Sequence, residues 1–126
     1  MDVQAFKTAY GASRNGCNFK VRHPLARQFV YSDGVKECAE AGCYWMLDIV
    51  GTEVVDAMRN HARVFDGMAF LYVVVKGDKA DLSLVRDDGE KPKWARHIEF
   101  TDMPEGKWVF YLADEGNVFM YLPSEY

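Results

Sequence analysis

The chain has 126 residues and a mass of 14.4 kDa, which is the size of one domain. Its residues are 49% hydrophobic and 27% charged, as in soluble globular proteins, and this composition excludes a disordered chain. The 19 acidic residues outnumber the 15 basic ones, and the resulting net charge of −4 excludes the strongly basic profile of a general nucleic-acid binder. We therefore expect a single domain over residues 1–126, in which residues 1–24 form an irregular, basic N-terminal segment.

Neither hydropathy nor cysteine usage indicates a membrane protein or a secreted protein. The longest apolar run, residues 68–75, has eight residues, whereas a membrane-spanning helix needs about 20. The N-terminus lacks the basic and apolar regions of a signal peptide. Cys17, Cys38 and Cys43 are an odd number of cysteines without a Cys-x-x-Cys pair, which argues against a disulfide framework. We expect a cytoplasmic protein with free thiols.

The first part of the chain has the pattern of a short helix followed by a loop. Asp2 is a suitable N-cap for a helix over residues 2–10, and Gly11 is a suitable terminator. Residues 11–18 are small and polar, which predicts a loop. Residues 18–22 alternate weakly between apolar and polar side chains and predict a strand, which ends at the following X-Pro pair.

The clearest helix signal follows a short apolar segment, residues 25–31. Ser32 or Asp33 can accept hydrogen bonds from the free N–H groups of a first helical turn. Apolar residues then recur at helical spacing, and Gly42 is a suitable C-cap. The pattern therefore predicts a helix that begins at one of these two caps and ends before Gly42.

A second helical stretch runs from Cys43 towards His61, with an apolar stripe at a period of 3.6 residues. Gly51 lies in the middle of this stripe, where a glycine costs about 1 kcal/mol of helix propensity. Thr52 follows it and can cap a new helix. The sequence leaves open whether this stretch is one helix or two helices that meet at Gly51.

From Val64 onwards the sequence changes to strand character. Runs rich in β-branched and aromatic residues alternate with turns that contain Gly, Asp, Asn or Pro. The expected strands are residues 70–76, 81–85, 94–100, 108–112 and 118–122. Because turns this short favour antiparallel neighbours, the sequence predicts an α+β fold in which N-terminal helices pack on a four- or five-stranded antiparallel sheet.

Charge is distributed unevenly along the chain. Residues 1–36 hold six basic and two acidic residues, whereas the remainder holds nine basic and 17 acidic residues. Residues 99–126 hold six acids against a single base, Lys107. Charges on loops keep a protein soluble, and the same pattern also describes an acidic face that meets a basic partner.

No residue pattern indicates a metal or a cofactor. His23, His61 and His97 are far apart in the sequence, and none has a second ligand at helical spacing. Cys38 and Cys43 are five residues apart, which is a poor spacing for a shared metal ion. Phosphate-binding glycine motifs are absent from the sequence. We therefore expect no metal site and no cofactor.

The signals for an enzyme are weak. The sequence has no Gly-x-Ser-x-Gly motif for a serine nucleophile. Cys17 lies near Arg14, Lys20 and His23 in the sequence, and basic neighbours can lower the pKa of a thiol, although a loop cysteine with such neighbours also arises easily by chance. A small enzyme would instead use a pocket between helices and sheet, with the participating residues Tyr44, Asp48 and His97.

Two parts of the sequence together resemble one family. The first is Phe-Val-Tyr-Ser-Asp-Gly-Val-Lys at residues 29–36, continued by Ala-Glu-Ala-Gly at 39–42 and Tyr-Trp-Met-Leu-Asp at 44–48. The second is the C-terminal Leu-Pro-Ser-Glu-Tyr at 122–126. These motifs resemble an uncharacterised family of small bacterial, plasmid and prophage proteins, over most of residues 20–126.

The resemblance implies an α+β domain and a setting in mobile elements, and it implies no catalytic residue. By analogy, small acidic phage proteins often bind host machinery, and anti-CRISPR proteins are the prominent case. The leading hypothesis is a non-enzymatic binding protein of a phage or mobile element that inhibits or modulates a host protein, such as a Cas effector complex. The motifs also have a structural interpretation, in which residues 33–34 start a helix, residues 44–45 pack it on the sheet and residues 123–126 close the last strand.

The expected partner is a host protein with a basic surface, bound through complementary charge. The residues expected to form the acidic surface are Asp87, Asp88, Glu90, Asp102, Glu105, Asp114 and Glu115. Direct binding to nucleic acid is not expected, and it stands as an alternative in which the basic N-terminal part contacts phosphates and stacks on bases. The stacking residues of that alternative are Phe6, Tyr10, Phe19 and Phe29.

Overall fold

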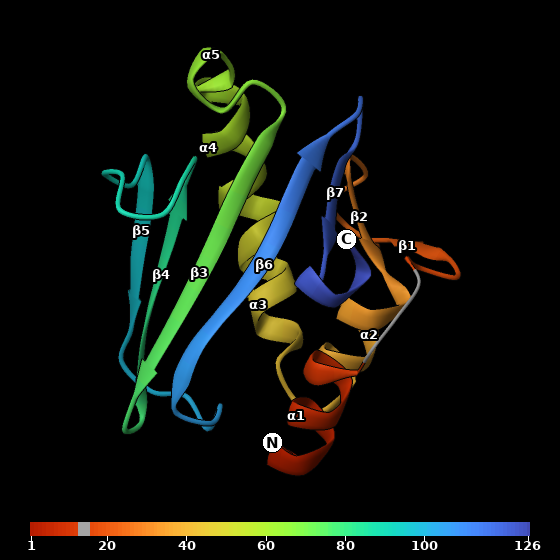
Figure 1. Ribbon diagram of the computed structural model, residues 1–126, viewed down its shortest axis with the longest axis vertical. Coiled ribbons are helices and arrows are strands. Elements are labelled where there is room, and N and C mark those ends of the chain that lie inside the picture. Colours follow the sequence, from red (N-terminus) through yellow and green to blue (C-terminus); the bar gives the residue numbers. More distant parts are fainter. Residues whose placement is uncertain (13–15) are drawn as a thin grey trace.

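A mixed sheet of seven strands organises the fold in the computed structural model, which describes residues 1–12 and 16–126 (Figure 1). The strands lie in the order β1-β2-β7-β6-β3-β4-β5. Their bounds are Lys20–Arg22 for β1, Phe29–Ser32 for β2, Met68–Lys76 for β3, Lys79–Val85 for β4, Trp94–Ile98 for β5, Gly106–Asp114 for β6 and Val118–Tyr121 for β7. All neighbouring strands are antiparallel except β2 and β7, which are parallel.

The α+β class is confirmed, and the predicted four- or five-stranded antiparallel sheet is corrected to a larger, mixed one. The five strands predicted after Val64 are β3 to β7, and β1 and β2 extend the sheet beyond them. Residues 25–31 supply most of β2, although their pattern predicted only a segment before a helix. Every residue of β2 is buried, so the strand lacks the alternation of apolar and polar residues that marks a half-exposed strand.

The order of the strands also departs from a simple meander. β3, β4 and β5 are neighbours in sequence and in space, and the chain then returns through residues 99–105 so that β6 pairs with the other edge of β3. Leu71 of β3 consequently lies between Leu84 of β4 and Phe110 of β6. The long central strands β3 and β6 are therefore covered by neighbours on both edges over most of their length.

Two helices, α1 (Val3–Gly11) and α2 (Asp33–Glu40), begin at caps that the sequence predicted. The other helical elements are α3 (Tyr44–Ile49), the π turn η1 (Val50–Val54), α4 (Val55–Asn60), α5 (Ala62–Phe65) and the 3-10 turn η2 (Pro123–Glu125). The Asp2 carboxylate accepts from the Ala5 N–H at 3.0 Å, and the Ser32 hydroxyl accepts from the Val35 N–H at 3.1 Å. Each cap stabilises its helix by about 1 kcal/mol.

The stretch from α3 to α4 is continuous and contains the π turn η1 at the glycine that left two alternatives open. A Cβ atom on Gly51 would lie 2.8 Å from the Cβ of Ala26 and 3.4 Å from the ring of Phe29. Glycine therefore lets the turn before β2 pack directly on this helix. The widened turn accommodates the contact without breaking the helix.

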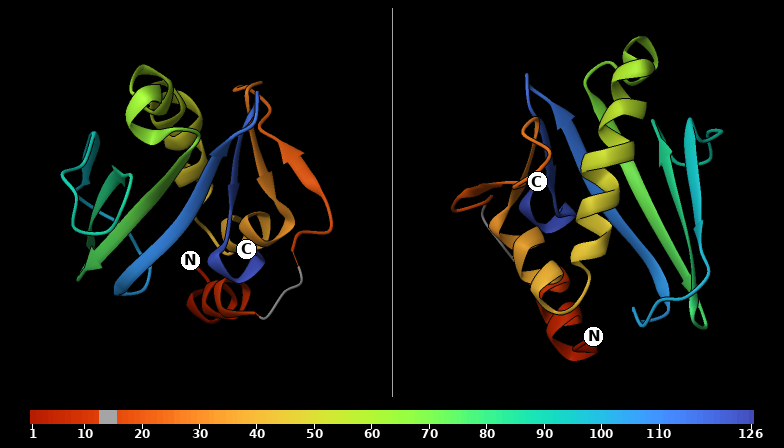
Figure 2. Two further views of the ribbon diagram at one scale, coloured as in Figure 1. Left: turned by 45° about the horizontal axis from the view of Figure 1, so that its top comes forward. Right: turned by 180° about the vertical axis from the view of Figure 1, so that it is seen from behind.

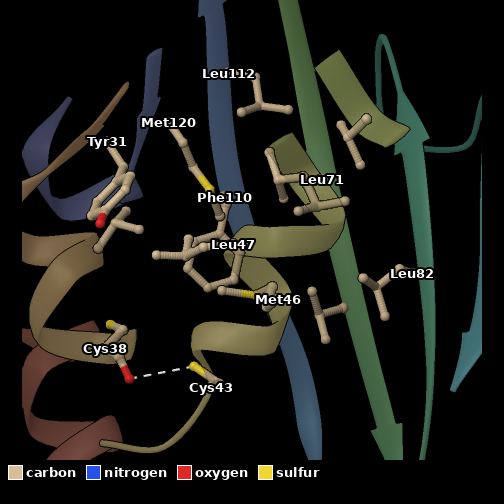
Figure 3. Packing of buried hydrophobic residues seen from close by; sticks show 14 of the residues in the cluster. Tyr31, Cys38, Cys43, Met46, Leu47, Leu71, Leu82, Phe110, Leu112 and Met120 are labelled. Carbon is tan, nitrogen blue, oxygen red and sulfur yellow. Dashed lines mark hydrogen bonds between the residues drawn. The ribbon is translucent and has the colours of Figure 1, made fainter. Parts of the chain in front are cut away.

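The core lies between the α3–α4 helix and one face of the sheet. Met46 and Leu47 of α3 point towards Leu71, Leu82 and Phe110 of the sheet (Figure 3). These five side chains are at most 1% exposed, and burial of each contributes roughly 1.5–3 kcal/mol of hydrophobic free energy. The face of the sheet that these helices cover therefore holds the hydrophobic core, and we call it the helix-covered face.

Helix α1 covers a part of β6 that has no strand beside it. β7 pairs with β6 only at residues 111–114, which leaves the backbone of Val109 without a strand partner on that side. The Tyr10 hydroxyl donates to the Val109 carbonyl at 3.2 Å and accepts from the Val109 N–H at 3.0 Å. Burial at this position raises the pKa of Tyr10.

Alternate residues of the central strands face away from the helices and are half-buried. The α3–α4 helix lies on the opposite side of the sheet (Figures 1 and 2), and no α-helix of the described residues covers this surface. We call it the open face and define it by Phe70, Tyr72, Val74, Val109, Tyr111, Ala113, Phe119 and Tyr121. Five of these eight residues are aromatic, so the open face presents rings where most solvated sheet faces present polar side chains.

Candidate functional site

The two segments that carry the family resemblance meet at one place in the fold. Glu125, at the end of η2, accepts a hydrogen bond from the Ser32 hydroxyl at 2.5 Å and another from the Leu122 N–H at 2.9 Å, both on Oε1. Ser32 is the N-cap of α2. The C-terminal turn is therefore fixed onto the first turn of α2, which is a larger structural role than closing the last strand.

Gly34 allows this contact because a side chain there would collide with Glu125. A Cβ atom on Gly34 would lie 2.8 Å from Oε2 of Glu125 and 2.9 Å from Cδ1 of Leu122. Glu125 is 7% exposed, and its Oε2 has no hydrogen-bond partner among the described residues. The carboxylate lies at the N-terminal end of α2, where the helix dipole favours a negative charge.

A second buried carboxylate lies beside this junction. Asp33 is 4% exposed, and its Oδ1 accepts from the Asn18 N–H at 3.1 Å. The Asp33 N–H donates to the Phe19 carbonyl at 3.1 Å. These two bonds hold residues 16–19 against α2, and they place Cys17 close to both carboxylates.

The pKa of the Cys17 thiol is raised, which is opposite to the lowering that its basic neighbours in the sequence suggested. Burial is the main cause, the carboxylates of Glu125 and Asp33 add to it, and Lys20 opposes it more weakly. Arg14, another of the predicted neighbours, lies outside the described residues. The thiol is therefore a poor nucleophile, because the reactive species is the thiolate.

A pocket of about 250 Å³ opens between this junction and the open face. Its lining residues are Cys17, Ala113, Glu115, Phe119, Tyr121, Glu125 and Tyr126. Of these lining residues, Tyr126 is 88% exposed, whereas Glu125 is buried. We call this space the Glu125 pocket.

The aromatic rings of the open face lead directly into the Glu125 pocket. Tyr111 lies at the centre of the row, with its ring centroid 5.1 Å from Phe70, 5.5 Å from Tyr121 and 5.8 Å from Tyr126. Phe119 and Tyr121 stack at 5.1 Å. Edge-to-face and stacked contacts of this kind contribute roughly 0.5–1.5 kcal/mol each, so the row is a preorganised surface.

Two lysines lie on this face, each held by a ring and a carboxylate. The Lys20 ammonium lies 4.2 Å above the Phe119 ring and 3.9 Å from Oε2 of Glu115. The Lys107 ammonium lies 4.0 Å above the Tyr72 ring and 3.3 Å from Oδ1 of Asp88. The open face thus binds an ammonium group twice with the same chemistry.

Tyr72 and Asp88 form the polar part of the second of these contacts. The Tyr72 hydroxyl donates to Oδ1 of Asp88 at 3.0 Å. Burial and the Asp88 carboxylate raise the pKa of Tyr72 to about 12. The Tyr72 hydroxyl and the Lys107 ammonium in turn lower the pKa of Asp88, so both groups hold their ordinary charge states over a wide pH range.

The seven acids predicted to form one acidic surface lie at two ends of the sheet. Asp87, Asp88 and Glu90 follow β4, and Asp114 and Glu115 lie at the end of β6. Asp102 and Glu105 lie before β6, at the opposite end of that strand. The acidic residues therefore flank the open face from two sides and do not gather into one patch.

Most of these acids also have partners in the fold. Asp102 contacts the amino group of Met1, and Asp114 lies 3.5 Å from Nε of Arg59. Glu105 accepts from the Gly77 N–H at 2.5 Å. Together with the lysine contacts of Asp88 and Glu115, these pairs leave much less free negative charge than the sequence indicated.

The residues of the enzyme alternative do not come together. Tyr44 and Asp48 lie on α3, whereas His97 lies on β5 between Asp81 at 2.7 Å and Glu99 at 3.0 Å. The space between helices and sheet is filled by the core side chains described above. The fold therefore places these three side chains on separate elements, two on α3 and one on the edge strand β5.

Asp48 pairs instead with a histidine that the sequence did not connect to it. Nε2 of His23 lies 2.8 Å from Oδ1 of Asp48, which projects from α3. Nδ1 of His23 accepts from the N–H groups of Leu25 and Ala26 at 3.2 and 3.0 Å. Because both ring nitrogens are engaged and the ring is 3% exposed, this pair fixes the turn before β2.

The aromatic residues of the nucleic-acid alternative are mostly part of the core. Phe6 and Phe29 are 0% exposed, and Tyr10 is bonded to the backbone of β6. Phe19, which is 53% exposed, is the exception among the four. The basic N-terminal part therefore offers no stacking surface of the predicted kind.

Neither a cluster of metal ligands nor a membrane-spanning helix occurs among the described residues. No group of three or more His, Cys, Asp or Glu side chains that could hold a metal ion occurs among residues 1–12 and 16–126. Cys43 is buried and donates to the Cys38 carbonyl at 3.3 Å, and burial raises the pKa of its thiol to about 12. Within the described part of the chain, no helix is long and apolar enough to cross a membrane.

The sequence drew attention to Cys17, Glu115 and the motif at 122–126 for other reasons and did not group them into a pocket. A signal for two further lining residues was also present. Phe119 and Tyr121 alternate with the buried Val118 and Met120 along β7, which marks them as the outward face of a strand. The contact between Glu125 and Ser32 joins residues 93 positions apart. A pairing of that kind cannot be read from spacing along the chain.

Comparison with known proteins identifies a family and no activity. One family model, described as a family of unknown function (DUF6876), matches residues 13–126. This match confirms the resemblance to an uncharacterised family. No curated protein and no solved structure matches the chain.

Proposed function

We propose that the chain, which belongs to the DUF6876 family, is a non-enzymatic binding protein that takes a basic segment of a partner protein on its open face. The observation that carries the proposal is the pair of lysines on that face. Lys20 and Lys107 each place an ammonium group over an aromatic ring and beside a carboxylate. These two contacts show that rings and carboxylates on this face can hold an ammonium group, and the face carries further rings that no lysine covers among the described residues.

Composition and charge support a basic protein as the partner. The net charge is −4, and the part of the chain that follows residue 36 carries nearly all of the acids. Tyrosine is enriched among the residues that dominate protein interfaces, because it buries a large ring and keeps a polar group. Acids at both ends of the face would raise the association rate with a basic segment and set its orientation.

The biological setting expected from the sequence stays a prediction. In that setting the protein is encoded by a phage or mobile element, acts in the cytoplasm of its host, and inhibits or modulates a host protein such as a Cas effector. Cas-type effectors hold nucleic acid in positively charged channels. They therefore carry the charge that this proposal requires of a partner.

The proposal is tested by affinity capture from a host lysate with the intact chain, followed by mass spectrometry of the bound proteins. The test variant Asp88→Lys/Glu115→Lys reverses the two carboxylates that hold lysines on the open face. The control variant Asp56→Lys/Asp78→Lys makes the same charge change on α4 and in the β3–β4 turn, away from that face. Thermal unfolding of both variants checks that they are folded.

We expect the test variant to lower capture of the partner about tenfold, which corresponds to the loss of about 1.4 kcal/mol of binding free energy. The control variant should capture the partner as the natural chain does. Equal losses in both variants would mean that capture reports net charge and not the open face. Unchanged capture by the test variant would remove the open face as the binding surface.

A single-stranded nucleic acid is the second candidate, because aromatic rings on a sheet beside Lys20, Arg22 and Lys107 can stack on bases and contact phosphates. Against it, two of these three cations are already engaged by carboxylates. Fluorescence anisotropy with a labelled single-stranded oligonucleotide tests it at low and high salt. Binding that weakens steeply with salt would favour this candidate over a protein partner.

A further inference from the structure

We infer that the Glu125 pocket binds the ammonium group of one lysine side chain of the partner, an assignment that rests on the proposed function. The pocket brings together the rings of Tyr121 and Tyr126 with the carboxylates of Glu115 and Glu125. It lies at the end of the aromatic row of the open face. A basic segment lying along that face would reach it with a side chain.

The two lysine contacts of the open face resemble the Glu125 pocket in composition. At Phe119 and at Tyr72, a ring and a carboxylate together hold an ammonium group. The Glu125 pocket contains a third combination of rings and carboxylates. Among the described residues, no cation–π contact involves Tyr121 or Tyr126, and no ion pair involves Glu125.

Two buried carboxylates lie at or near the pocket: Glu125 lines it, and Asp33 lies outside the lining and acts on the lining residue Cys17. Glu125 and Asp33 are 7% and 4% exposed, and neither forms an ion pair with another described residue. A buried carboxylate without a cation is costly. The Ser32 hydroxyl and the N-terminus of α2 offset part of that cost, while Oε2 of Glu125 has no hydrogen-bond partner in the described chain. Because Oε2 is buried against Gly34, an ammonium group in the pocket would offset more of this cost through the field of the carboxylate and not through a direct contact with Oε2.

The field of these carboxylates reaches the pocket. Cys17 lines it, and Glu125 is the charge that most raises the pKa of that thiol, followed by Asp33. Because a negative field that keeps a thiol protonated also attracts a cation, the same cause favours ammonium binding. The volume of about 250 Å³ accommodates the end of one lysine side chain and is too small for a folded element.

The test is an NMR titration of the intact chain with n-butylammonium chloride, which carries the end of a lysine side chain, at constant ionic strength. A parallel titration with 1-butanol supplies a neutral molecule of the same shape. We expect n-butylammonium to give saturable shifts at Cys17, Tyr121 and Tyr126 and 1-butanol to give none there. Shifts of equal size with both molecules would overturn the assignment, since the pocket would then be binding an alkyl chain.

Two variants keep the test independent of folding. Tyr126→Leu removes an exposed ring whose loss should not unfold the protein, and we expect it to weaken n-butylammonium about fivefold. Tyr44→Leu is the matched control, because it removes a half-exposed ring on α3, far from the pocket residues in the fold. Equal weakening in both variants would contradict the assignment. Glu125→Gln, if folded, should abolish the shifts.

The result also separates this assignment from the proposed function. If the partner is captured through the open face while n-butylammonium leaves the Glu125 pocket unshifted, the assignment fails and the proposed function stands. If n-butylammonium binds the pocket while Asp88→Lys/Glu115→Lys leaves capture unchanged, the proposed function fails and the pocket remains a cation site.

Discussion

The two faces of the sheet are built from the same strands and have opposite chemistry. On β3, Ala69, Leu71 and Val73 face the helices and are fully buried, whereas Phe70 and Tyr72 face the open side and remain half-buried. The helix-covered face is aliphatic and is closed by α3 and α4. The open face is aromatic and carries lysines and carboxylates.

This difference separates the residues that stabilise the fold from those available for binding. An aliphatic face contributes to the free energy of folding through close packing, and it leaves no surface for a partner once the helices cover it. An aromatic face with charges keeps rings and polar groups at the surface, where they can contact a second molecule. The following predictions test that division, beginning with the largest expected effect.

If the two faces differ in this way, a valine-to-alanine substitution should lower the free energy of unfolding by unequal amounts at the adjacent residues Val73 and Val74. Val73→Ala removes two buried methyl groups from the helix-covered face and should lower the free energy of unfolding by about 2–3 kcal/mol. Val74→Ala makes the identical change on the open face and should cost at most about 1 kcal/mol. Urea denaturation of both variants measures the difference. Similar costs would mean that the open face is packed as tightly as the core.

The junction that anchors the Glu125 pocket gives the next largest effect. Gly34→Ala forces a Cβ atom against the Glu125 carboxylate, which two hydrogen bonds hold in place, and should cost about 2 kcal/mol. Gly11→Ala is the control, because no atom outside its own helix and chain neighbours lies within 4 Å of the added Cβ. It should be neutral or stabilise the chain by less than about 1 kcal/mol. A neutral Gly34→Ala would show that the junction is loose.

Local signals in the sequence were sufficient for much of the helix-covered half. Asp2 and Ser32 cap helices because their side chains bond to N–H groups three residues later, and such bonds depend on short spacing alone. The β-branched and aromatic residues of β3 likewise predicted a strand, but its continuous apolar run did not predict which side chains face the helices. The sequence did not predict β2 as a strand. All four of its residues are buried, so they show no alternation of apolar and polar side chains.

The candidate site was far less predictable, because long-range contacts create it. Gly34, Ser32 and Glu125 come from opposite ends of the domain, and their contact requires the parallel pairing of β2 with β7. The number of acidic residues in the sequence also overestimates the free negative charge of the folded protein. A carboxylate such as Asp88 counts as free negative charge in a sequence, yet Lys107 reaches it from a different strand.

The titration of Tyr72 should report its burial on the open face and its hydrogen bond to Asp88. Burial first, and then the Asp88 carboxylate, raise the pKa of its phenol to about 12. Because the folded pKa exceeds the ordinary value of 10.0, the resulting stabilisation is present below pH 10 and is lost as the pH rises through about 12. Asp88→Asn should lower the pKa, as followed by NMR of the ring. An unchanged pKa in that variant would remove the Tyr72–Asp88 bond from the description of the face.

The smallest effect is expected at the outer strand, where the open face ends in a charged cluster. Hydrogen bonds from His97 to Asp81, and then to Glu99, raise the pKa of the imidazole above 6.5. The contribution of this cluster to stability is therefore full below the unfolded pKa and is lost as the pH rises through the folded one. An NMR titration should place the His97 pKa above 6.5 and show that Asp81→Asn lowers it. Asp78→Asn, in the adjacent turn, should leave it unchanged. If Asp78→Asn lowers the pKa equally, the shift reflects the general acidity of this edge and not the bond to Asp81.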